Sequence, residues 1–242
     1  MKYDFLPEVN EVQLRILTKL TTSPNGLRYS EMRPFDEYLE NDLYNYHLQY
    51  LVKNELVSKE GNLYQTTEKG KVLTTNMDAL GKVQQLFKVS VALQVVREVN
   101  GKREILRHKR LRHPFYGDVT SVSGKVHHGE LIEDAAKRKL KEETGLEAEF
   151  KLLGVLRKIR KNKQGKLIED TLYHVCYAEN PIGKLIKKNV YGENFWSNFD
   201  QAIQFIKLNT DVGEYDIKIL EHIHDNNLER LYWQQTTVVN TY

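Results

Sequence analysis

The chain has 242 residues, of which 40% are hydrophobic and 29% charged, and its formal net charge is +3. These values are typical of a globular protein with one or two domains, large enough to hold a core without disulfides. The longest apolar stretch, around Val89–Val96, falls far short of the roughly 20 residues of a membrane-spanning helix. We therefore expect no membrane partner.

The single cysteine, Cys176, excludes an intrachain disulfide and a zinc site built from several cysteines. We expect it to be a small buried apolar residue. The first ten residues lack the basic and then apolar pattern of a signal peptide. A reducing, cytoplasmic setting is the expectation that follows.

The first eighty residues alternate helical and strand patterns. Apolar residues at helical spacing predict a helix over residues 9–20, and the turn Ser23–Gly26 follows it. A short helix is predicted over Tyr29–Phe35, disturbed or ended by Pro34. A longer helix follows over 40–57, then two strands flanking Glu60-Gly61, and then a helix from Thr67 to about Leu80.

This order of three helices, a hairpin and a helix resembles a winged helix-turn-helix. The segment NYHLQYLVKNELVSKEGNLYQTTEKGKVL carries the resemblance, which covers about residues 8–80. It is similar to the part of bacterial winged-helix regulators that contains the recognition helix and the wing. The resemblance implies a DNA-binding fold in residues 1–82.

The remainder of the chain, residues 83–242, predicts a second domain of mixed strands and helices. The dipeptide Asn100-Gly101 predicts a hairpin between strands at Leu86–Glu98 and Glu104–Leu111. Further elements are a helix that ends at Gly145, two long strands around residues 162–165, an irregular stretch up to Trp196, and two helices. The ranges of the three helices are Glu130–Thr144, Asp200–Lys207 and Glu214–His224.

Residues 124–146, GKVHHGELIEDAAKRKLKEETGL, carry the chemistry. Gly124 and Gly129 allow tight turns in a short loop. Glu142 and Glu143 are adjacent carboxylates near a helix end, and position 139 lies on their side of the helix. Paired carboxylates beside loop carbonyls suit a hard cation such as Mg²⁺, which can assist attack on a phosphoanhydride.

This stretch resembles the Nudix box, Gly-x5-Glu-x7-Arg-Glu-U-x-Glu-Glu-x-Gly-U, where U is a bulky aliphatic residue. Eight of the nine fixed positions match. The resemblance implies an α/β/α sandwich, hence an overall α+β protein, and a Mg²⁺ or Mn²⁺ cofactor. The matching positions are Gly124, Glu130, Arg138, Leu140, Glu142, Glu143, Gly145 and Leu146.

Carried over onto this sequence, the resemblance makes Glu142, Glu143 and Arg138 the catalytic candidates. The metal candidates are Glu142, Glu143 and the backbone at Gly124. Gly124, Lys125, Gly129 and Glu130 form the candidate substrate loop. Arg138 is expected to hold the loop and helix together through an ion pair, with Glu130 as the partner that the family suggests.

The ninth position departs from the family, because Lys139 stands where the family has Glu. The exchange changes the local charge by two units. The ammonium can occupy the space of a second cation or pair with Glu142 and Glu143 and weaken metal binding. The resemblance therefore implies the fold more strongly than it implies hydrolysis.

Other residues near this stretch are secondary candidates. Glu193, in an acidic position before Trp196, is considered as an extra ligand or base, and Glu169 and Asp170 are weaker candidates. His127 and His128 are expected to be exposed loop residues. Basic residues over 103–112 and 157–166 can steer an anionic ligand or nucleic acid, or form solvated strand faces.

Two functions from different classes follow, and a protein-interaction module is a third. The first is a metal-dependent Nudix pyrophosphohydrolase acting on a nucleoside diphosphate linked to another group, with the winged helix as an accessory. The second is a transcriptional regulator whose Nudix domain binds ADP-ribose or a related nucleotide. A homodimer is compatible with both. The two retained glutamates favour the hydrolase.

Charge bears on this choice. Residues 1–80 contain nine Lys and Arg against twelve Asp and Glu, so this part of the chain has a net charge of −3 and the remainder has +6. DNA binding relies on cationic contacts to phosphate, so an acidic domain is poorly equipped for it. If it binds DNA, the local candidates for phosphate contacts and base readout are Arg28, Arg33, Asn41, Asn45, Gln49, Lys53 and Lys59.

Overall fold

The computed structural model describes residues 8–32, 40–74, 87–209, 211 and 213–239. The chain forms two compact units, residues 1–86 and 87–242. The division predicted after residue 82 lies within a segment outside the described residues, as do Arg33 and Pro34. No helix in the described ranges has the length and apolarity needed to cross a membrane.

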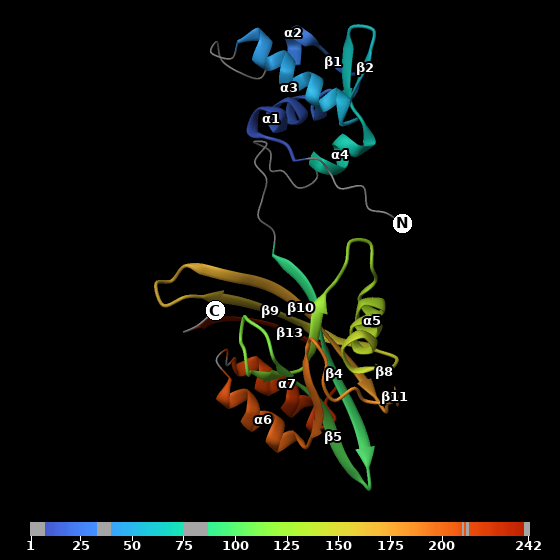
Figure 1. The fold of residues 1–242 in the computed structure, drawn as a ribbon, viewed down its shortest axis with the longest axis vertical. Helices are drawn as coiled ribbons and strands as arrows, with labels where there is room; N and C mark the ends of the chain where they lie inside the picture. The colour runs from blue at the N-terminus through green and yellow to red at the C-terminus, as the bar shows by residue number, and fades with distance from the viewer. Residues whose placement is uncertain (1–7, 33–39, 75–86, 210, 212, 240–242) are drawn as a thin grey trace. The chain divides into compact units, whose positions relative to one another are not determined.

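The described residues of the N-terminal unit form four helices and a small sheet (Figure 1). Helix α1 begins after Asn10, whose side chain accepts a hydrogen bond from the Gln13 amide, while the Gln13 side chain accepts one from the Asn10 amide. This capping box satisfies backbone donors that the first turn leaves unpaired. The elements in order are α1 (Glu11–Thr21), β1 (Leu27–Arg28), α2 (Tyr29–Met32), α3 (Asn41–Lys53), β2 (Val57–Glu60), β3 (Leu63–Thr66) and α4 (Glu68–Thr74).

The core of this unit lies between α1, α3 and the hairpin β2–β3. Leu17 and Leu20 of α1 pack with Leu48 and Leu51 of α3, and all four are at most 2% exposed. The three strands pair in the order β1-β3-β2 and form the sheet that contains the wing. The predicted helices and hairpin are present, but α3 ends at Lys53 and not at residue 57, because the chain turns at Glu55, whose φ is 58°, and enters β2. The parts of the second and last helices predicted beyond Met32 and Thr74 lie outside the described residues.

The C-terminal unit is built on an eight-stranded mixed sheet with path β12-β5-β4-β10-β9-β13, on which β6 pairs with β5 and β7 with β4. Asn100 and Gly101 both have positive φ, at 51° and 72°, as the predicted two-residue hairpin turn requires. The main strands are β4 (Lys88–Val99), β5 (Lys102–Arg110), β6 (Val119–Thr120), β7 (Val122–Lys125), β9 (Lys151–Lys161), β10 (Leu167–Glu179), β12 (Gly192–Ser197) and β13 (Leu231–Val238).

Helices cover both faces of this sheet (Figure 1). Side chains alternate along each strand, so neighbouring residues of one strand contact different helices. Val95 and Leu106 face the helix α5 (Ile132–Thr144). Val96 and Ile105, one residue away, face α6 (Phe199–Leu208) and α7 (Glu214–His224). A short pair, β8 (Leu146–Glu147) and β11 (Ile182–Gly183), lies beside α5.

The sequence predictions differ from this unit in several elements, and the short strands β6, β7, β8 and β11 are among those not predicted. Helix α5 begins at Ile132 instead of Glu130, because the Glu130 carboxylate serves the preceding loop. The stretch up to Trp196 is irregular only in part, since β12 pairs with β5. Strand β13 was not predicted; it carries polar residues on the exposed face of a sheet edge, which weakens the apolar signal.

Candidate functional site

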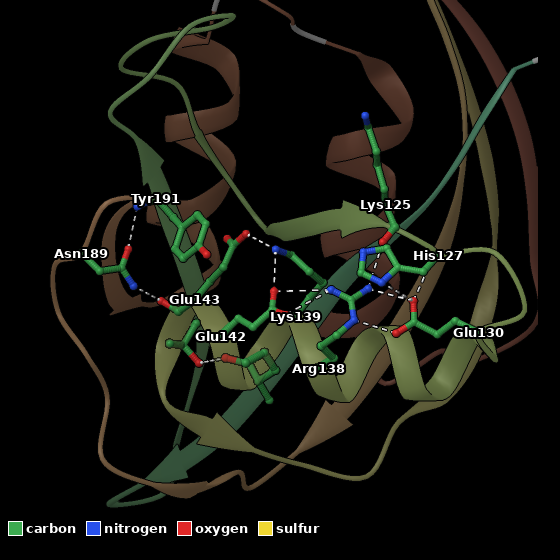
Figure 2. Close-up of polar contacts among 11 residues, drawn as sticks. Lys125, His127, Glu130, Arg138, Lys139, Glu142, Glu143, Asn189 and Tyr191 are labelled. Carbon is green, nitrogen blue, oxygen red and sulfur yellow. Dashed lines mark hydrogen bonds and ion pairs between the residues drawn. The ribbon is translucent and has the colours of Figure 1, made fainter. Parts of the chain in front are cut away.

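Arg138 connects the loop and the helix of residues 124–146 (Figure 2). Its Nε and Nη2 atoms donate to the two oxygens of Glu130 at 2.6 and 2.8 Å, and Nη2 also donates to the Lys125 carbonyl at 3.1 Å. The hydrogen bond from Arg138, aided by the amide of His127, lowers the pKa of Glu130 to about 2. The ion pair expected between Arg138 and Glu130 is present and braces the loop.

Lys139 lies between the two adjacent glutamates, as Figure 2 shows. Its Nζ atom is 3.1 Å from Oε2 of Glu142 and 2.8 Å from Oε1 of Glu143. The side chain of Lys139 is 11% exposed and that of Glu143 is 4% exposed. One ammonium therefore bridges a buried carboxylate and the partly exposed carboxylate of Glu142.

Charge interactions keep this bridge ionised. Burial by itself would lower the pKa of Lys139, but the hydrogen bond and charge of Glu143, and then of Glu142, outweigh burial and raise it. Burial acts to raise the pKa of Glu142, yet Lys139 and then Arg138 lower it. Each group stabilises the charged form of the other.

Gly124 makes room for Lys139. A β-carbon at residue 124 would lie 2.3 Å from Cε and 2.5 Å from Cδ of Lys139, closer than carbon atoms can approach. The lysine stem thus runs directly over the backbone of β7. Its ammonium also lies 5.2 Å from the centre of the Tyr191 ring, a favourable cation–π distance.

Two asparagines hold the end of α5. Nδ2 of Asn194 donates to the Glu143 carbonyl at 2.7 Å and to the Ile186 carbonyl at 2.9 Å. Its Oδ1 contacts Nδ1 of His108 at 2.8 Å. Asn189 donates to the same Glu143 carbonyl at 2.7 Å. Sequence reasoning missed both residues, because nothing local distinguishes a buried asparagine from a loop asparagine.

The carboxylates as arranged do not fit a bound Mg²⁺ or Mn²⁺. Oxygens that a cation would take from Glu142 and Glu143 are instead hydrogen-bonded to Lys139. Among the described residues, no three His, Cys, Asp or Glu side chains form a group that could hold a metal ion. Glu193 lies apart from Glu142 and Glu143. It forms an ion pair with Lys188 at 2.8 Å and does not line the pocket that these two glutamates line.

The pocket at this site is strongly cationic. It is lined by six cationic side chains and three carboxylates, with Ser90, Ser123, Gly124, His127 and Tyr173. Burial and then the charge of the neighbouring Arg112 lower the pKa of Arg110, while Tyr173, Glu143 and Glu169 act in the opposite direction. The cations are Lys88, Arg110, Arg112, Lys125, Arg138 and Lys139, and the carboxylates are Glu142, Glu143 and Glu169.

Three of these cations are available to an anion. Among the residues that the structure describes, Arg110, Arg112 and Lys125 form no ion pair with a carboxylate. Arg110 donates from Nε to the Pro114 carbonyl, and Arg112 lies over the ring of Tyr191. The arrangement therefore attracts an anionic group such as a diphosphate without a metal ion.

The other predicted residues are placed as follows. Gly129 has φ of 76° in the loop, and Gly145 has φ of 74° and ends α5 as predicted. Asp170 pairs with Arg157 on the hairpin β9–β10, away from the pocket. In the N-terminal unit, the described nucleic-acid candidates are all exposed: Arg28, Asn41, Asn45, Gln49, Lys53 and Lys59.

These features define a Nudix fold preceded by a winged helix. The NUDIX domain model matches residues 88–220, more than half of the chain, and the winged helix-turn-helix model matches residues 16–85. The chain belongs to the Nudix family. No curated protein sequence matches the chain.

Solved structures share the fold of the C-terminal unit. The NUDIX domain of Shewanella oneidensis NrtR, complexed with ADP ribose, is 16% identical with a TM-score of 0.51. The match covers 66% of this chain and 99% of that domain. The MutT protein of Bacillus halodurans is 20% identical with a TM-score of 0.50, covering 63% and 91%. At these identities the likeness concerns the fold alone.

Proposed function

We propose that this chain is a ligand-responsive DNA-binding protein, whose Nudix domain binds a nucleoside diphosphate derivative without efficient hydrolysis. One observation carries the proposal. The Lys139 ammonium lies within 3.1 Å of both Glu142 and Glu143, where a hydrolase of this family would need free carboxylate oxygens for a metal. The same pocket carries Arg110, Arg112 and Lys125 as cations for an anionic ligand.

The sequence by itself favoured the hydrolase, because both glutamates of the box are retained. The contacts of Lys139 reverse that preference. A lysine that is 11% exposed and bonded to two carboxylates is difficult to displace, because removing it leaves two buried or half-buried negative charges close together. The phosphates of the ligand are then left to Arg110, Arg112 and Lys125, because the charge of Lys139 is neutralised by the two carboxylates.

The winged helix supports the second half of the proposal. Asn41, Asn45, Gln49 and Lys53 recur every four residues along α3 and are all exposed, so they form one polar stripe on this helix. Amide side chains at such positions read base edges in the major groove. The acidic balance of residues 1–80 limits the phosphate contacts, so binding must be concentrated on few cations.

Calorimetric titration of the full chain with ADP-ribose tests the ligand half, with EDTA in one series and Mg²⁺ in the other. ADP-ribose is the probe because a protein of this fold, NrtR, was crystallised with it. We expect equal affinity in both series and unchanged ADP-ribose on chromatography after the titration. Arg112→Met should weaken binding, whereas Lys163→Met, a matched loss of an exposed cation on the β9–β10 hairpin, should not.

A hydrolase remains the second candidate, favoured by the retention of Glu142 and Glu143 on α5. Metal-dependent release of nucleotide products that disappears in Glu143→Gln would establish it and overturn the proposal. Failure of both ADP-ribose and inorganic pyrophosphate to bind would leave an interaction module as the remaining function.

A further inference from the structure

A cavity of about 150 Å³ lies on the face of the sheet covered by α6 and α7. Its walls include Leu156, Val175, Ile206 and Ile219. A cavity of roughly this size holds one six-membered ring. The cavity adjoins the cationic pocket, because both are lined by Arg110, Ser123, Glu169 and Tyr173. A ligand can therefore occupy both spaces at once.

Two buried polar side chains in this cavity have atoms without partners among the described residues. Arg107 is 2% exposed, and within this part of the chain neither its Nε nor its Nη1 atom has a hydrogen-bond partner. Gln94 is 5% exposed, and its Oε1 atom has none within the same residues. Val96 and Ile105 are paired across β4 and β5. Gln94 precedes Val96 by two residues and Arg107 follows Ile105 by two, so all four side chains face the same side of the sheet.

Orphan buried groups of this kind are costly, and native proteins retain few of them. Burial lowers the pKa of Arg107 to about 10, with Asp216 acting in the opposite direction. Asp216 itself is occupied, since it accepts from Lys158 at 2.8 Å and from Gln235 at 3.2 Å. Arg107 thus presents donors, and Gln94 an acceptor, to whatever enters the cavity.

The charged side chains that line the cavity balance when Arg107 is counted among them. Lys158 pairs with Asp211 at 2.9 Å, and Arg160 pairs with Asp211 at 2.7 Å and with Glu169 at 2.6 Å. An added anion would upset this balance, whereas an uncharged polar group would not. The four cations are Arg107, Arg110, Lys158 and Arg160, and the four carboxylates are Asp118, Glu169, Asp211 and Asp216.

We propose that this cavity binds the uncharged base of the nucleotide ligand, with Arg107 donating to a ring acceptor and Gln94 accepting from a ring N–H. The apolar walls contact the ring faces, and the diphosphate extends into the cationic pocket. This inference rests on the proposed function, because it assigns the second half of the same ligand. It makes Arg107 the residue that distinguishes a nucleotide from a bare diphosphate.

The test compares inorganic pyrophosphate with the diphosphates of adenosine, guanosine, uridine and cytidine by calorimetry on the full chain. We expect at least one nucleotide to bind ten or more times tighter than pyrophosphate. In Arg107→Met this advantage should be lost while pyrophosphate binding is unchanged. UMP against ribose 5-phosphate separates the base from the sugar, since uracil is a single six-membered ring and only the base distinguishes these two probes.

Arg103→Met is the matched control. Arg103 is on the same strand and points to the same face, but its guanidinium donates to the Ile223 carbonyl at 3.0 Å and does not line the cavity. Arg103→Met should lower thermal stability and keep the nucleotide advantage. Arg107→Met should keep or raise the Tm of the unliganded protein, because it removes an unpaired buried charge.

Three results overturn the inference. The first is that no nucleotide binds tighter than pyrophosphate. The second is that the tighter binding of a nucleotide than of pyrophosphate survives both Arg107→Met and Gln94→Leu. The third is a marked loss of Tm in Arg107→Met, which would make Arg107 structural. In each case pyrophosphate binding would leave the proposed function standing. If neither pyrophosphate nor any nucleotide binds, the proposed function fails and this inference fails with it.

Discussion

The ammonium of Lys139 lies 2.8 Å from Oε1 of Glu143, one turn further along the same helix, and both side chains are almost entirely buried. This single contact changes the function that residues 124–146 can perform. With Glu at position 139, three carboxylates would face one another and call for a metal ion. With Lys there, the charges are satisfied within the protein.

The first prediction concerns this contact. Lys139→Glu should destabilise the protein without metal, because three carboxylates then repel one another, and Mg²⁺ should restore the stability by binding the folded state. Thermal unfolding with EDTA and with Mg²⁺ measures this difference. Lys141→Glu, an exposed change on the same helix, is the control. An equal response of both variants to Mg²⁺ would contradict the account.

A second prediction concerns the ion pair of Glu130 with Arg138. The pKa of Glu130 in the folded protein, about 2, is below the ordinary value of 4.5. The contribution of this carboxylate to the free energy of unfolding is therefore complete above the unfolded pKa and is lost as the pH falls towards 2. Glu130→Gln should therefore cost about 1–3 kcal/mol at pH 7, allowing for partial solvation, and progressively less below pH 4.5.

Urea unfolding of wild type and Glu130→Gln across this pH range gives the measurement. Glu149→Gln, whose carboxylate is 88% exposed beside Lys137, should show almost no effect at any pH. A stability difference between wild type and Glu130→Gln that does not shrink in acid would show that the ion pair is not its source.

The third prediction concerns Asn194. Asn194→Ala should destabilise the protein by roughly 2–4 kcal/mol, because the Ile186 carbonyl and the His108 ring lose the hydrogen bonds that Asn194 gives them. The Glu143 carbonyl would keep only the hydrogen bond from Asn189. It should also weaken pyrophosphate binding, since the end of α5 would no longer be held. Chemical unfolding with calorimetry measures both, and the exposed Gln234→Ala serves as the reference. A loss below about 0.5 kcal/mol, typical of surface changes, would contradict the bridging role.

A fourth prediction concerns helix α3. On duplexes selected from a random pool, Lys53→Gln should weaken binding to all sequences and lower the salt slope by about 0.9. Gln49→Ala should instead reduce discrimination at one base pair by about 1–3 kcal/mol. Lys19→Gln, an exposed change on α1, should alter neither. Failure to recover any bound duplex would remove the DNA-binding half of the proposal.

Much of the fold is readable from local patterns. The helices α1, α3, α6 and α7 follow from apolar spacing, and the β4–β5 hairpin follows from Asn100-Gly101. Strands β12 and β13 are not readable in this way, because they lie at the two edges of the sheet and bury little apolar surface. Their existence depends on partners far along the chain, Arg110 and Gly154 among them.

The sequence by itself determined the family, because a spaced motif of eight matching residues is a local property. It also determined that Lys139 replaces a glutamate. Only the tertiary structure decided what that lysine does, since the outcome depended on Gly124 passing beneath its stem and on Asn194 holding the carbonyl of Glu143. The same holds for Arg107, whose lack of partners is a property of the folded cavity. Charges separated in sequence interact according to distance and burial, and those are set by packing.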